Sequence, residues 1–424
     1  MLQTDPVAPG PSRLGRRTSL LTVRTFDDAC RFLFPRTRGI KWGLETTEAL
    51  LGALGHPERH FTSVHVGGTN GKGSTCAMLA SVMRAAGFRV GLYTSPHLVS
   101  FRERVVVDGV AISESAVAAW VGRLEEVAIE REASFFEITT AAAFADLAAR
   151  GAEIAIIEVG LGGRLDSTNV LTPVACGVTR IALEHTDYLG PDLAGIAREK
   201  AGIAKLGVPF VTTEPDDGVA AVLEAEARSR GAPFERVPVA RGAGFVLGLA
   251  GPHQVANAAL AVRLAELLPP RFGVNEAAVR SGLRDARLPG RFDRRGRWLF
   301  DVAHNPDGIR SLVSALRATS VPRPVVAVVS ILKDKAWREM LELLAPAVEA
   351  LMLTCAPSAP TDRVWSLEEA EAWARSAGLP VTAESDFDQA LALAGRGAAT
   401  ALVTGSFHTV GDAMARLPGC APLG

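Results

Sequence analysis

A glycine-rich loop between an apolar run and a helical pattern is the feature that most constrains this chain. Phe61–Gly67 is apolar and β-branched, which favours a strand, and Ser74–Ala86 has helical periodicity. The loop between them needs glycine to turn from strand into helix. Its peptide N–H groups, the positive end of the helix and the Lys72 ammonium would all favour a bound phosphate. The predicted phosphate-binding residues are Gly68, Thr69, Asn70, Gly71, Lys72, Gly73, Ser74 and Thr75.

The loop departs from the standard P-loop at one position. Gly73 follows Lys72, where Ser or Thr normally binds Mg²⁺. Another segment must therefore supply a hydroxyl. A glycine-rich turn with one exposed lysine is the weaker alternative, because a strand precedes the loop and a helix follows it. A dinucleotide fingerprint does not fit, since the spacing is not GxGxxG and a lysine occupies the centre.

Strand-length apolar runs alternate with helical stretches along the whole chain. The expected strands are Phe61–Gly67, Phe88–Tyr93, Ile154–Val159, Val174–Ile181, Pro209–Thr212, Trp298–Val302, Val325–Val329, Ala350–Leu353 and Thr400–Val403. This rhythm predicts α/β architecture with doubly wound, mostly parallel sheets. A chain of 424 residues is longer than one hydrophobic core can serve. Leu288–Phe292 contains Pro and Gly and lies between the first series of expected strands and the second. We therefore expect a disordered tail at 1–19, a P-loop ATP-binding domain at 20–288 and a smaller Rossmann-like domain at 289–424.

Composition excludes several classes of partner. The 45 basic and 46 acidic side chains give a net charge of −1, so no global field favours nucleic acid or an anionic membrane. The five cysteines are scattered without CxxC spacing, which favours a reducing cytosol over a disulfide framework or a zinc knuckle. The first 19 residues lack the apolar core of a signal peptide, and no apolar run reaches transmembrane length. We expect a cytoplasmic protein.

Polar side chains follow three of the expected strands. Ser95 comes after the Phe88–Tyr93 run, Glu158 closes the IAII run and His185 lies just past Val174–Ile181. Ligands gather at the carboxyl ends of parallel strands, so these side chains could converge on one Mg²⁺. Spacing alone leaves this open, because a single Ser, Glu or His is more often structural or solvated.

Seven strings carry a resemblance to a known family. They are HVGGTNGKGST, GLYTSPHL, EVGLGGRLDSTN, EKAGIAK, GPHQVANAA, DVAHNPDG and TGSFH, in this order. The set closely resembles the folylpolyglutamate synthases of the Mur ligase superfamily, from about Lys41 to about Val410. GTNGKG is shared with other Mur-type ligases, whereas TSPHL together with GLGGRLDSTN is more specific to the folate branch.

The resemblance implies roles around the phosphates. Ser95, Glu158 and His185 match the ligands of a Mg²⁺ that bridges the ATP phosphates, and Lys72 matches the phosphate-loop lysine. Lys200 matches a lysine that this family carbamylates with CO₂, which would help to hold a second Mg²⁺. The residues alone would make Lys200 an ordinary lysine on a helix surface. The implied catalytic residues are Lys72, His185, Lys200 and His304.

Further positions match nucleotide and substrate contacts. Asn257 matches a residue that meets the adenine, and Arg291 and Asp301 match nucleotide-binding residues contributed by the second domain. His304 and Asn305 match positions near the phosphates and the incoming amino acid.

The reaction implied is ATP-dependent addition of L-glutamate to the γ-carboxylate of folate through an acyl phosphate, by a monomer. Phe101, Arg102, Phe136 and Glu137 are candidates for the apolar pocket of the pterin and aminobenzoate rings. The aromatic pair at Phe135 and Phe136 could equally be core at the start of a helix.

Alternatives and departures remain at this stage. A bifunctional enzyme that also joins dihydropteroate to glutamate needs the same chemistry, and a cell-wall Mur ligase fits the strings less well. A P-loop switch or motor should have a standard GK[ST] and a basic groove, and a nucleotide-binding regulator would bind ATP without turnover. Glu184 stands where the family pattern has aspartate, and Thr46 stands where it has arginine.

Overall fold

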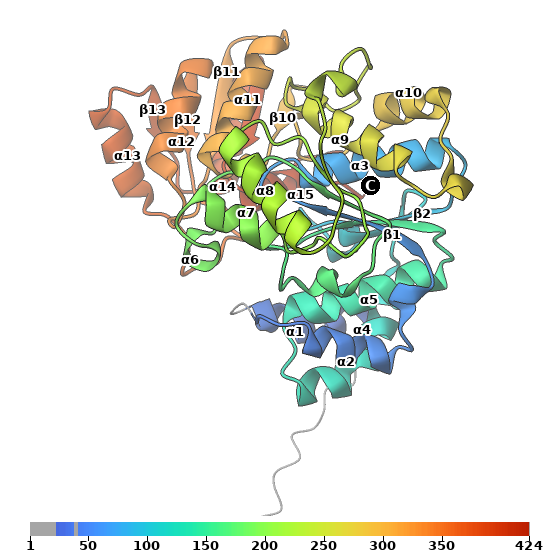
Figure 1. Cartoon of the computed structure of the whole chain (residues 1–424). Coiled ribbons are helices and arrows are strands. Elements are labelled where there is room, and N and C mark those ends of the chain that lie inside the picture. The colour runs from blue at the N-terminus through green and yellow to red at the C-terminus, as the bar shows by residue number, and fades with distance from the viewer. Residues whose placement is uncertain (1–22, 38–40, 424) are drawn as a thin grey trace, which may run out of the picture.

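The computed structural model describes residues 23–37 and 41–423 and contains two α/β domains, each built on its own sheet (Figure 1). The expected tail at 1–19 lies outside the described residues. The first sheet has eight strands in the order β4-β3-β2-β5-β1-β6-β7-β8, parallel except for β3 and β4. Its strands are β1 (Thr62–Gly67), β2 (Val90–Tyr93), β3 (Val105–Val107), β4 (Val110–Ala111), β5 (Ile154–Glu158), β6 (Ala175–Val178), β7 (Phe210–Thr212) and β8 (Phe234–Arg236).

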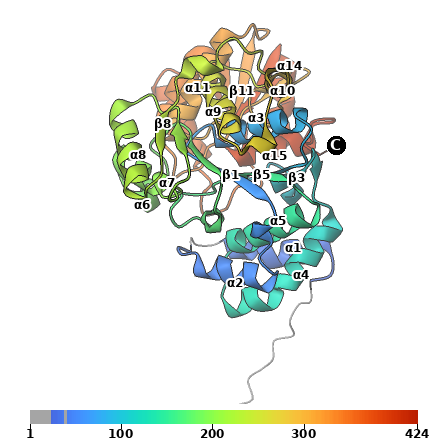
Figure 2. The same ribbon diagram turned by 45° about the vertical axis from the view of Figure 1, so that its right-hand side comes forward.

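Helices cover both faces of this sheet (Figures 1 and 2). Alternate residues of β5 show the two faces, since Ile154 and Ile156 join the core under α3, α9 and α10, and Ala155 and Ile157 join the core under α1, α2, α4 and α5. The helices are α1 (Phe26–Leu33), α2 (Glu45–Ala53), α3 (Lys72–Ala85), α4 (Glu114–Glu130), α5 (Phe135–Ala149), α6 (Thr186–Leu189), α7 (Leu193–Ala201), α8 (Asp217–Ser229), α9 (Gln254–Glu266) and α10 (Glu276–Asp285).

The second domain repeats the plan on a smaller scale. Its six strands have the order β13-β12-β11-β14-β10-β9, with β9 alone antiparallel to its neighbour. They are β9 (Asp293–Arg295), β10 (Trp298–Phe300), β11 (Val325–Val329), β12 (Ala350–Leu353), β13 (Val381–Ala383) and β14 (Thr400–Thr404). The helices are α11 (Pro306–Ala318), α12 (Trp337–Leu344), α13 (Leu367–Ser376), α14 (Phe387–Gly397) and α15 (Phe407–Arg416). The expected division after Leu288 falls between the two sheets.

The α/β architecture expected from the sequence is confirmed, and all nine expected runs contain or border a strand, whereas β3 was not expected. The helix after the phosphate loop begins at Lys72, two residues before the expected Ser74, because Gly71 takes a left-handed conformation with φ of 96° and starts the helix directly.

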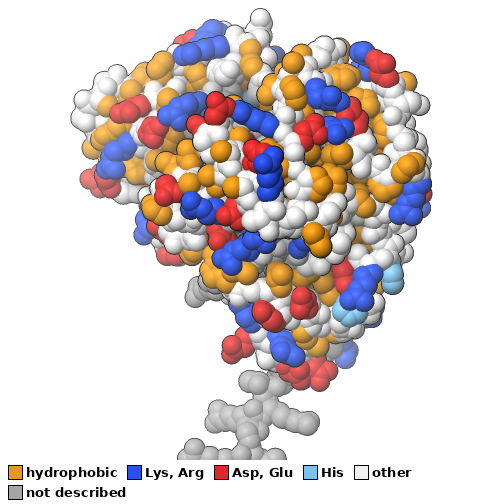
Figure 3. Space-filling model, in the orientation of Figure 1, with side chains coloured by type: hydrophobic (Ala, Val, Ile, Leu, Met, Phe, Trp, Pro, Cys, Tyr) orange, Lys and Arg blue, Asp and Glu red, His pale blue; other side chains and the backbone are white. Residues whose placement is uncertain are grey.

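The loop after β2 also touches the second domain. A Cβ at Gly411 of α15 would lie 2.1 Å from the Leu98 carbonyl oxygen, and one at Gly290 would lie 3.2 Å from Leu98 Cδ1. The two domains therefore meet closely beside the TSPHL segment. On the face drawn in Figure 3, acidic and basic side chains are interspersed, in keeping with the net charge of −1.

Candidate active site

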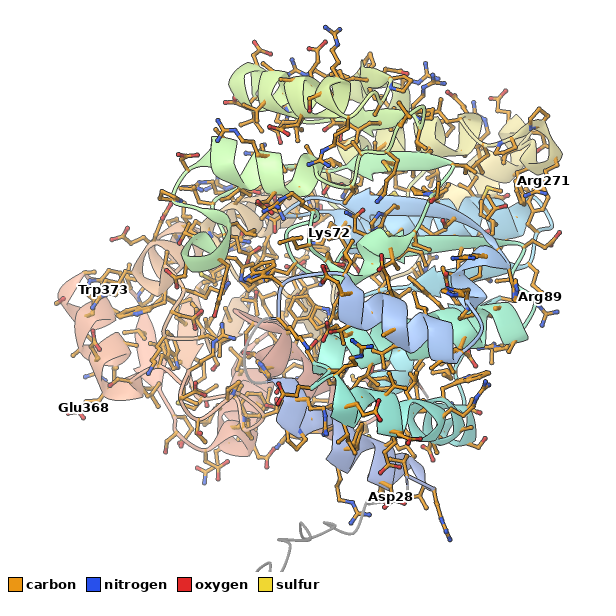
Figure 4. All side chains as sticks on the ribbon, turned by 60° about the horizontal axis from the view of Figure 1, so that its bottom comes forward. Asp28, Lys72, Arg89, Arg271, Glu368 and Trp373 are labelled. Carbon is orange, nitrogen blue, oxygen red and sulfur yellow. The ribbon has the colours of Figure 1, made fainter. Side chains whose placement is uncertain are left out.

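The phosphate loop connects β1 to α3, and Figure 4 shows Lys72 near the junction of the two domains. Glycine is required in the loop for close approach as well as for the turn. A Cβ at Gly68, with φ of +133°, would lie 1.8 Å from Thr179 Oγ1. A Cβ at Gly71 would lie 2.4 Å from Asn257 Oδ1. The loop is thus held between the end of β6 and the start of α9, which fixes where its N–H groups point.

Lys72 curls back over its own loop. Its ammonium donates to the carbonyl oxygens of Gly68 and Thr69, both at 3.1 Å. Its charge is therefore kept beside the peptide groups that would surround a phosphate. The strand–loop–helix arrangement predicted from the sequence is present, and the weaker alternative of a lysine on a solvated turn does not describe it.

Ser95 and Glu158, predicted to share a metal ion, are brought together. The Ser95 backbone N–H donates to Glu158 Oε2 at 2.9 Å. The first turn of α3 borders the same carboxylate, since a Cβ at Gly73 would lie 3.6 Å from each of its oxygens. A longer side chain at position 73 would intrude on this space. A carboxylate and a hydroxyl are the oxygen ligands that Mg²⁺ prefers, so these residues fit the ion that the family pattern implies.

Glu158 is a buried acid with cations around it. Burial raises the pKa of its carboxyl, while Lys72, the Ser95 N–H, Arg291 and Arg104 act in the opposite direction. The carboxylate is thus surrounded by positive groups from three parts of the chain. Burial outweighs these groups and keeps the pKa above its ordinary value, so a further cation beside the carboxyl would favour its charged form.

Lys200 is buried, with 5% of its surface exposed, and its ammonium donates to the Gly68 carbonyl oxygen at 2.8 Å. The reading of Lys200 as a helix-surface lysine, which the residues alone favoured, is wrong. Burial, with a smaller effect from Lys72, lowers the pKa of Lys200 to about 7. Near neutral pH much of the amine is therefore unprotonated and able to react.

Glu184 and His185 lie directly before α6, several residues past the end of β6, and Glu184 faces the second domain. Glu184 Oε1 is 2.8 Å from His304 Nε2 and 3.1 Å from Lys335 Nζ. His304 Nδ1 lies 2.8 Å from the Val302 carbonyl oxygen, so both ring nitrogens face acceptors. His185 keeps an exposed surface, and the protein packed around its ring lowers the pKa of the imidazole, so the ring is neutral near neutral pH and can bind a metal.

Arg291 and Asp301 stabilise the start of the second domain. Asp301 accepts hydrogen bonds from the N–H groups of Phe292 at 2.9 Å and Ala303 at 3.0 Å, and so ties the segment before β9 to the end of β10. The Arg291 guanidinium lies 5.0 Å from the centre of the Phe407 ring. Asp301 and Glu158, one from each domain, both interact electrostatically with Arg291. The cation therefore stands between the two halves of the site.

Asn257 and Asn305 are both buried beside the phosphate loop. Asn257 donates to Gln254 Oε1 at 2.8 Å, within the first turn of α9. Asn305 caps α11 by accepting from the Gly308 N–H at 2.7 Å and pairs with the Asn70 amide at 3.2 Å. The second domain thus contacts the tip of the loop.

The residues predicted for the ring pocket differ in their surroundings. Phe101 is buried and packs edge-on against Phe135, with ring centres 6.1 Å apart. Arg102 donates to the Ile112 carbonyl oxygen at 2.7 Å. Glu137 is buried in a capping box with Ser134 at the start of α5. These contacts account for the three residues without a ligand, and their part in substrate binding stays a prediction.

Phe136 is the member of that group that reaches the candidate site. A Cβ at Gly160 would lie 2.3 Å from the Phe136 ring, so the aromatic side chain rests on the glycine-rich segment directly after Glu158. A flat apolar face beside that acid suits an aromatic substrate.

Three residues near the loop escaped the sequence analysis. Asp307, Arg180 and Lys335 each make a polar contact between the domains, through Asn70, Asp307 and Glu184 respectively. Each follows soon after a strand of its own domain, at the edge where ligands gather in parallel sheets. That signal could have pointed to them, although it could not have paired them.

Family models match both halves of the chain. The Mur ligase middle domain matches residues 66–231 and the Mur ligase glutamate ligase domain matches residues 290–407. The dihydrofolate synthase/folylpolyglutamate synthase of Escherichia coli is 35% identical over 394 residues, covering 89% of this chain and 92% of its own length. The chain belongs to the folylpolyglutamate synthase family of Mur ligases.

Solved structures of that family share the whole architecture. The E. coli FolC protein in complex with DHPP and ADP aligns with a TM-score of 0.81 and 34% identity, covering 92% of this chain and 97% of that one. A bifunctional folylpolyglutamate synthase/dihydrofolate synthase with Mn, AMPPNP and L-glutamate bound aligns with a TM-score of 0.79 and 34% identity, at the same coverage. Within residues 23–37 and 41–423, no helix is long and apolar enough to cross a membrane.

Proposed function

We propose that this chain is an ATP-dependent ligase that joins L-glutamate to the γ-carboxylate of a folate through an acyl phosphate. One observation carries most weight. The phosphate loop lacks its own metal-binding hydroxyl at Gly73, and the Glu158 carboxylate, which accepts from the Ser95 backbone N–H, borders the space beside Gly73. A P-loop switch or motor would keep the hydroxyl in the loop. Membership of the folylpolyglutamate synthase family supports the same substrate class.

The chain's own groups address the electrostatic difficulty of the first step. A carboxylate must approach the γ-phosphate of ATP, so anion meets anion. Lys72 and the loop N–H groups neutralise charge that shifts among the phosphate oxygens. A divalent cation held by Ser95, Glu158 and His185 would add Lewis-acid neutralisation there. Arg291 supplies a further cation from the second domain, and contact between the domains excludes water from the acyl phosphate.

Lys200 suits carbamylation in this scheme. Its unprotonated amine nitrogen would attack the carbon of CO₂, form an N–C bond and release one proton to solvent. The product is an anion at the base of the phosphate loop, where a second divalent cation would find a ligand. The lowered pKa of about 7 and the buried position support this proposal. Intact-mass measurement under CO₂, compared with CO₂-free buffer and with Lys200→Met, tests it.

Dihydropteroate is the second candidate acceptor. Several relatives, among them the proteins of Bacillus subtilis and E. coli, are named for both activities, whereas the relative from Lacticaseibacillus casei is named folylpolyglutamate synthase only. The two acceptors need the same phosphoryl and amide chemistry, and differ in what the ring pocket must hold.

An ADP-release assay with single and paired substrates tests the function. We expect release only when Mg-ATP, glutamate and a folate are all present, and loss of release by orders of magnitude in Lys72→Ala. Dihydropteroate in place of folate decides the second activity. Release with UDP-muramyl substrates, or release that no acceptor stimulates, would contradict the proposal.

A further inference from the structure

Asp307 of the second domain binds the phosphate loop of the first. It lies in the first turn of α11, with 14% of its side chain exposed. One carboxylate oxygen accepts from Asn70 Nδ2 at 2.8 Å, and the other accepts from Arg180 Nε at 2.7 Å. Both partners belong to the first domain. A single carboxylate from the second domain thus joins the loop side chain to the chain segment that follows β6.

Arg180 supports the same loop through its backbone. Its carbonyl oxygen accepts from the N–H groups of Thr69 at 2.9 Å and Asn70 at 3.3 Å. The Arg180 side chain and backbone therefore contact different parts of the protein. The guanidinium binds the second domain, and the carbonyl oxygen holds the phosphate loop of the first. A displacement of Asp307 is passed to the loop by two routes, through Asn70 and through Arg180.

The position of Asp307 is itself well defined. Asn305 caps α11 and pairs with the Asn70 amide in both directions, each at 3.2 Å. The N-terminus of α11 is therefore fixed against the loop at two neighbouring points. Because Asp307 follows Asn305 by two residues, its backbone is held beside the loop, within reach of Asn70 and Arg180.

The charges explain why an acid can stand so near a triphosphate site. A lone carboxylate would repel the phosphates of ATP, whereas the Arg180 guanidinium neutralises it at hydrogen-bond distance. The pair lets Asp307 orient Asn70 without disfavouring the nucleotide. Removal of Arg180 alone would leave this acid uncompensated beside the ligand.

We propose that Asp307 is a positioning residue that sets the phosphate loop when the two domains meet, acting through Asn70 and Arg180. The nucleotide site is then completed by a group that does not touch the nucleotide. The inference rests on the proposed function for its turnover readout only, because nucleotide binding can be measured whatever the acceptor proves to be.

The test uses the full chain and a small set of variants. Binding of Mg-AMPPNP is measured by calorimetry for Asp307→Ala, Asp307→Asn, Arg180→Gln and the double variant that combines Asp307→Asn with Arg180→Gln. We expect about tenfold weaker binding in Asp307→Ala, and a larger loss in Arg180→Gln. The double variant should recover part of that loss, since the introduced amide keeps an acceptor for Asn70 and removes the uncompensated charge. In turnover assays kcat should fall while KM for glutamate stays near its wild-type value.

The matched control is Arg310→Ala, which removes an exposed ion pair between Arg310 of α11 and Glu339 of α12. It should leave nucleotide affinity unchanged. A purely structural role for Asp307 predicts additive losses in the double variant, together with a lower Tm. Additive losses, or binding within about twofold of wild type in folded Asp307→Ala, would overturn the inference. Failure of the proposed function would instead appear as wild-type protein that binds Mg-AMPPNP and does not turn over.

Discussion

Gly73 leaves 3.6 Å between the position of an added Cβ and each carboxylate oxygen of Glu158. The Ser95 backbone N–H donates to the same carboxylate. The missing side chain at Gly73 and the loop after β2 therefore both lie beside Glu158, where we propose that the Ser95 hydroxyl serves as a metal ligand. The neighbouring Ser74 is buried, and its hydroxyl lies 3.5 Å from Gln254 Nε2, directed toward α9.

This geometry predicts different effects for the two serines. Ser95→Ala should raise the Mg²⁺ concentration needed for half-maximal turnover severalfold, because it removes a proposed ligand. Ser74→Ala is the matched control and should raise it less. Magnesium titrations of both purified variants at saturating ATP provide the measurement. The reverse order would place the metal on the loop itself.

Lys200 predicts a pH dependence of stability. Its pKa is about 7 in the fold and near 10.5 in the unfolded chain, so between these values the unfolded state binds more protons. The cost of burying the ammonium is fully present below pH 7 and disappears as the pH rises toward 10.5. The stability of wild type relative to Lys200→Met should therefore increase over that window. Urea unfolding in CO₂-free buffer at about pH 6 and about pH 9 checks the trend, and a difference that stays constant would contradict it.

Single residues also show how far sequence alone could go. The proximity of Ser95 and Glu158 was predictable, because parallel strands end at a common edge. The burial of Lys200 was not predictable, because it depends on the packing of α7 against Gly68 of the phosphate loop, which is distant in the sequence. Glu137 differs, because the S-x-x-E spacing that gives its capping box with Ser134 is visible in the sequence.

The segment after β5 is organised by one buried acid. Asp166 accepts from the N–H groups of Leu161 at 2.8 Å and Thr168 at 3.0 Å, and from the Thr168 hydroxyl. Thr168 Oγ1 is in turn 2.8 Å from His65 Nε2 on β1. The glycine-rich turn that follows Glu158 is thus tied to the neighbouring strand.

We expect Asp166→Ala to destabilise the fold by about 2 kcal/mol, because buried N–H groups would lose their acceptor. Asp192→Ala is the control, since that exposed residue caps α7 through one hydrogen bond to the Gly195 N–H. It should cost about 1 kcal/mol or less. Urea unfolding with matched m-values measures both. Equal losses would show that burial adds nothing at Asp166.

Among the strands, predictability followed burial. β5, β11 and β14 are continuous apolar runs and lie within the predicted ranges or extend them by one residue. The edge strands β4, β9 and β13 are two or three residues long and carry polar or exposed residues, so no apolar run predicted them. Their pairing comes from neighbours in the sheet rather than from their own composition.

Glu184 shows what the departure from aspartate does at the scale of the whole molecule. The carboxylate reaches His304 and Lys335 of the second domain at 2.8 and 3.1 Å. Burial alone would raise the pKa of this carboxyl, but His304 and Lys335 hold it well below its ordinary value. The longer side chain thus forms a contact between domains.

Shortening this side chain should loosen the contact. In Glu184→Asp we expect Mg-nucleotide to protect the bond after the exposed Arg287 less well from trypsin, and scattering to report a larger radius of gyration with nucleotide bound. Glu369→Asp serves as control, because it shortens the acidic side chain of an ion pair that lies within the second domain. Equal protection in wild type and Glu184→Asp would mean that Glu184 does not restrain the domains.

The approach of Leu98 to α15 has a consequence for how this chain can change over time. Position 411 has no clearance for even one methyl group, because the Leu98 carbonyl oxygen occupies that place. An alanine there would force Leu98 and α15 apart, with the charged contacts between the domains left intact. A mutation at this position would therefore disturb how the two domains meet while each keeps its own core, and a search of the nucleotide-contacting residues alone would overlook it.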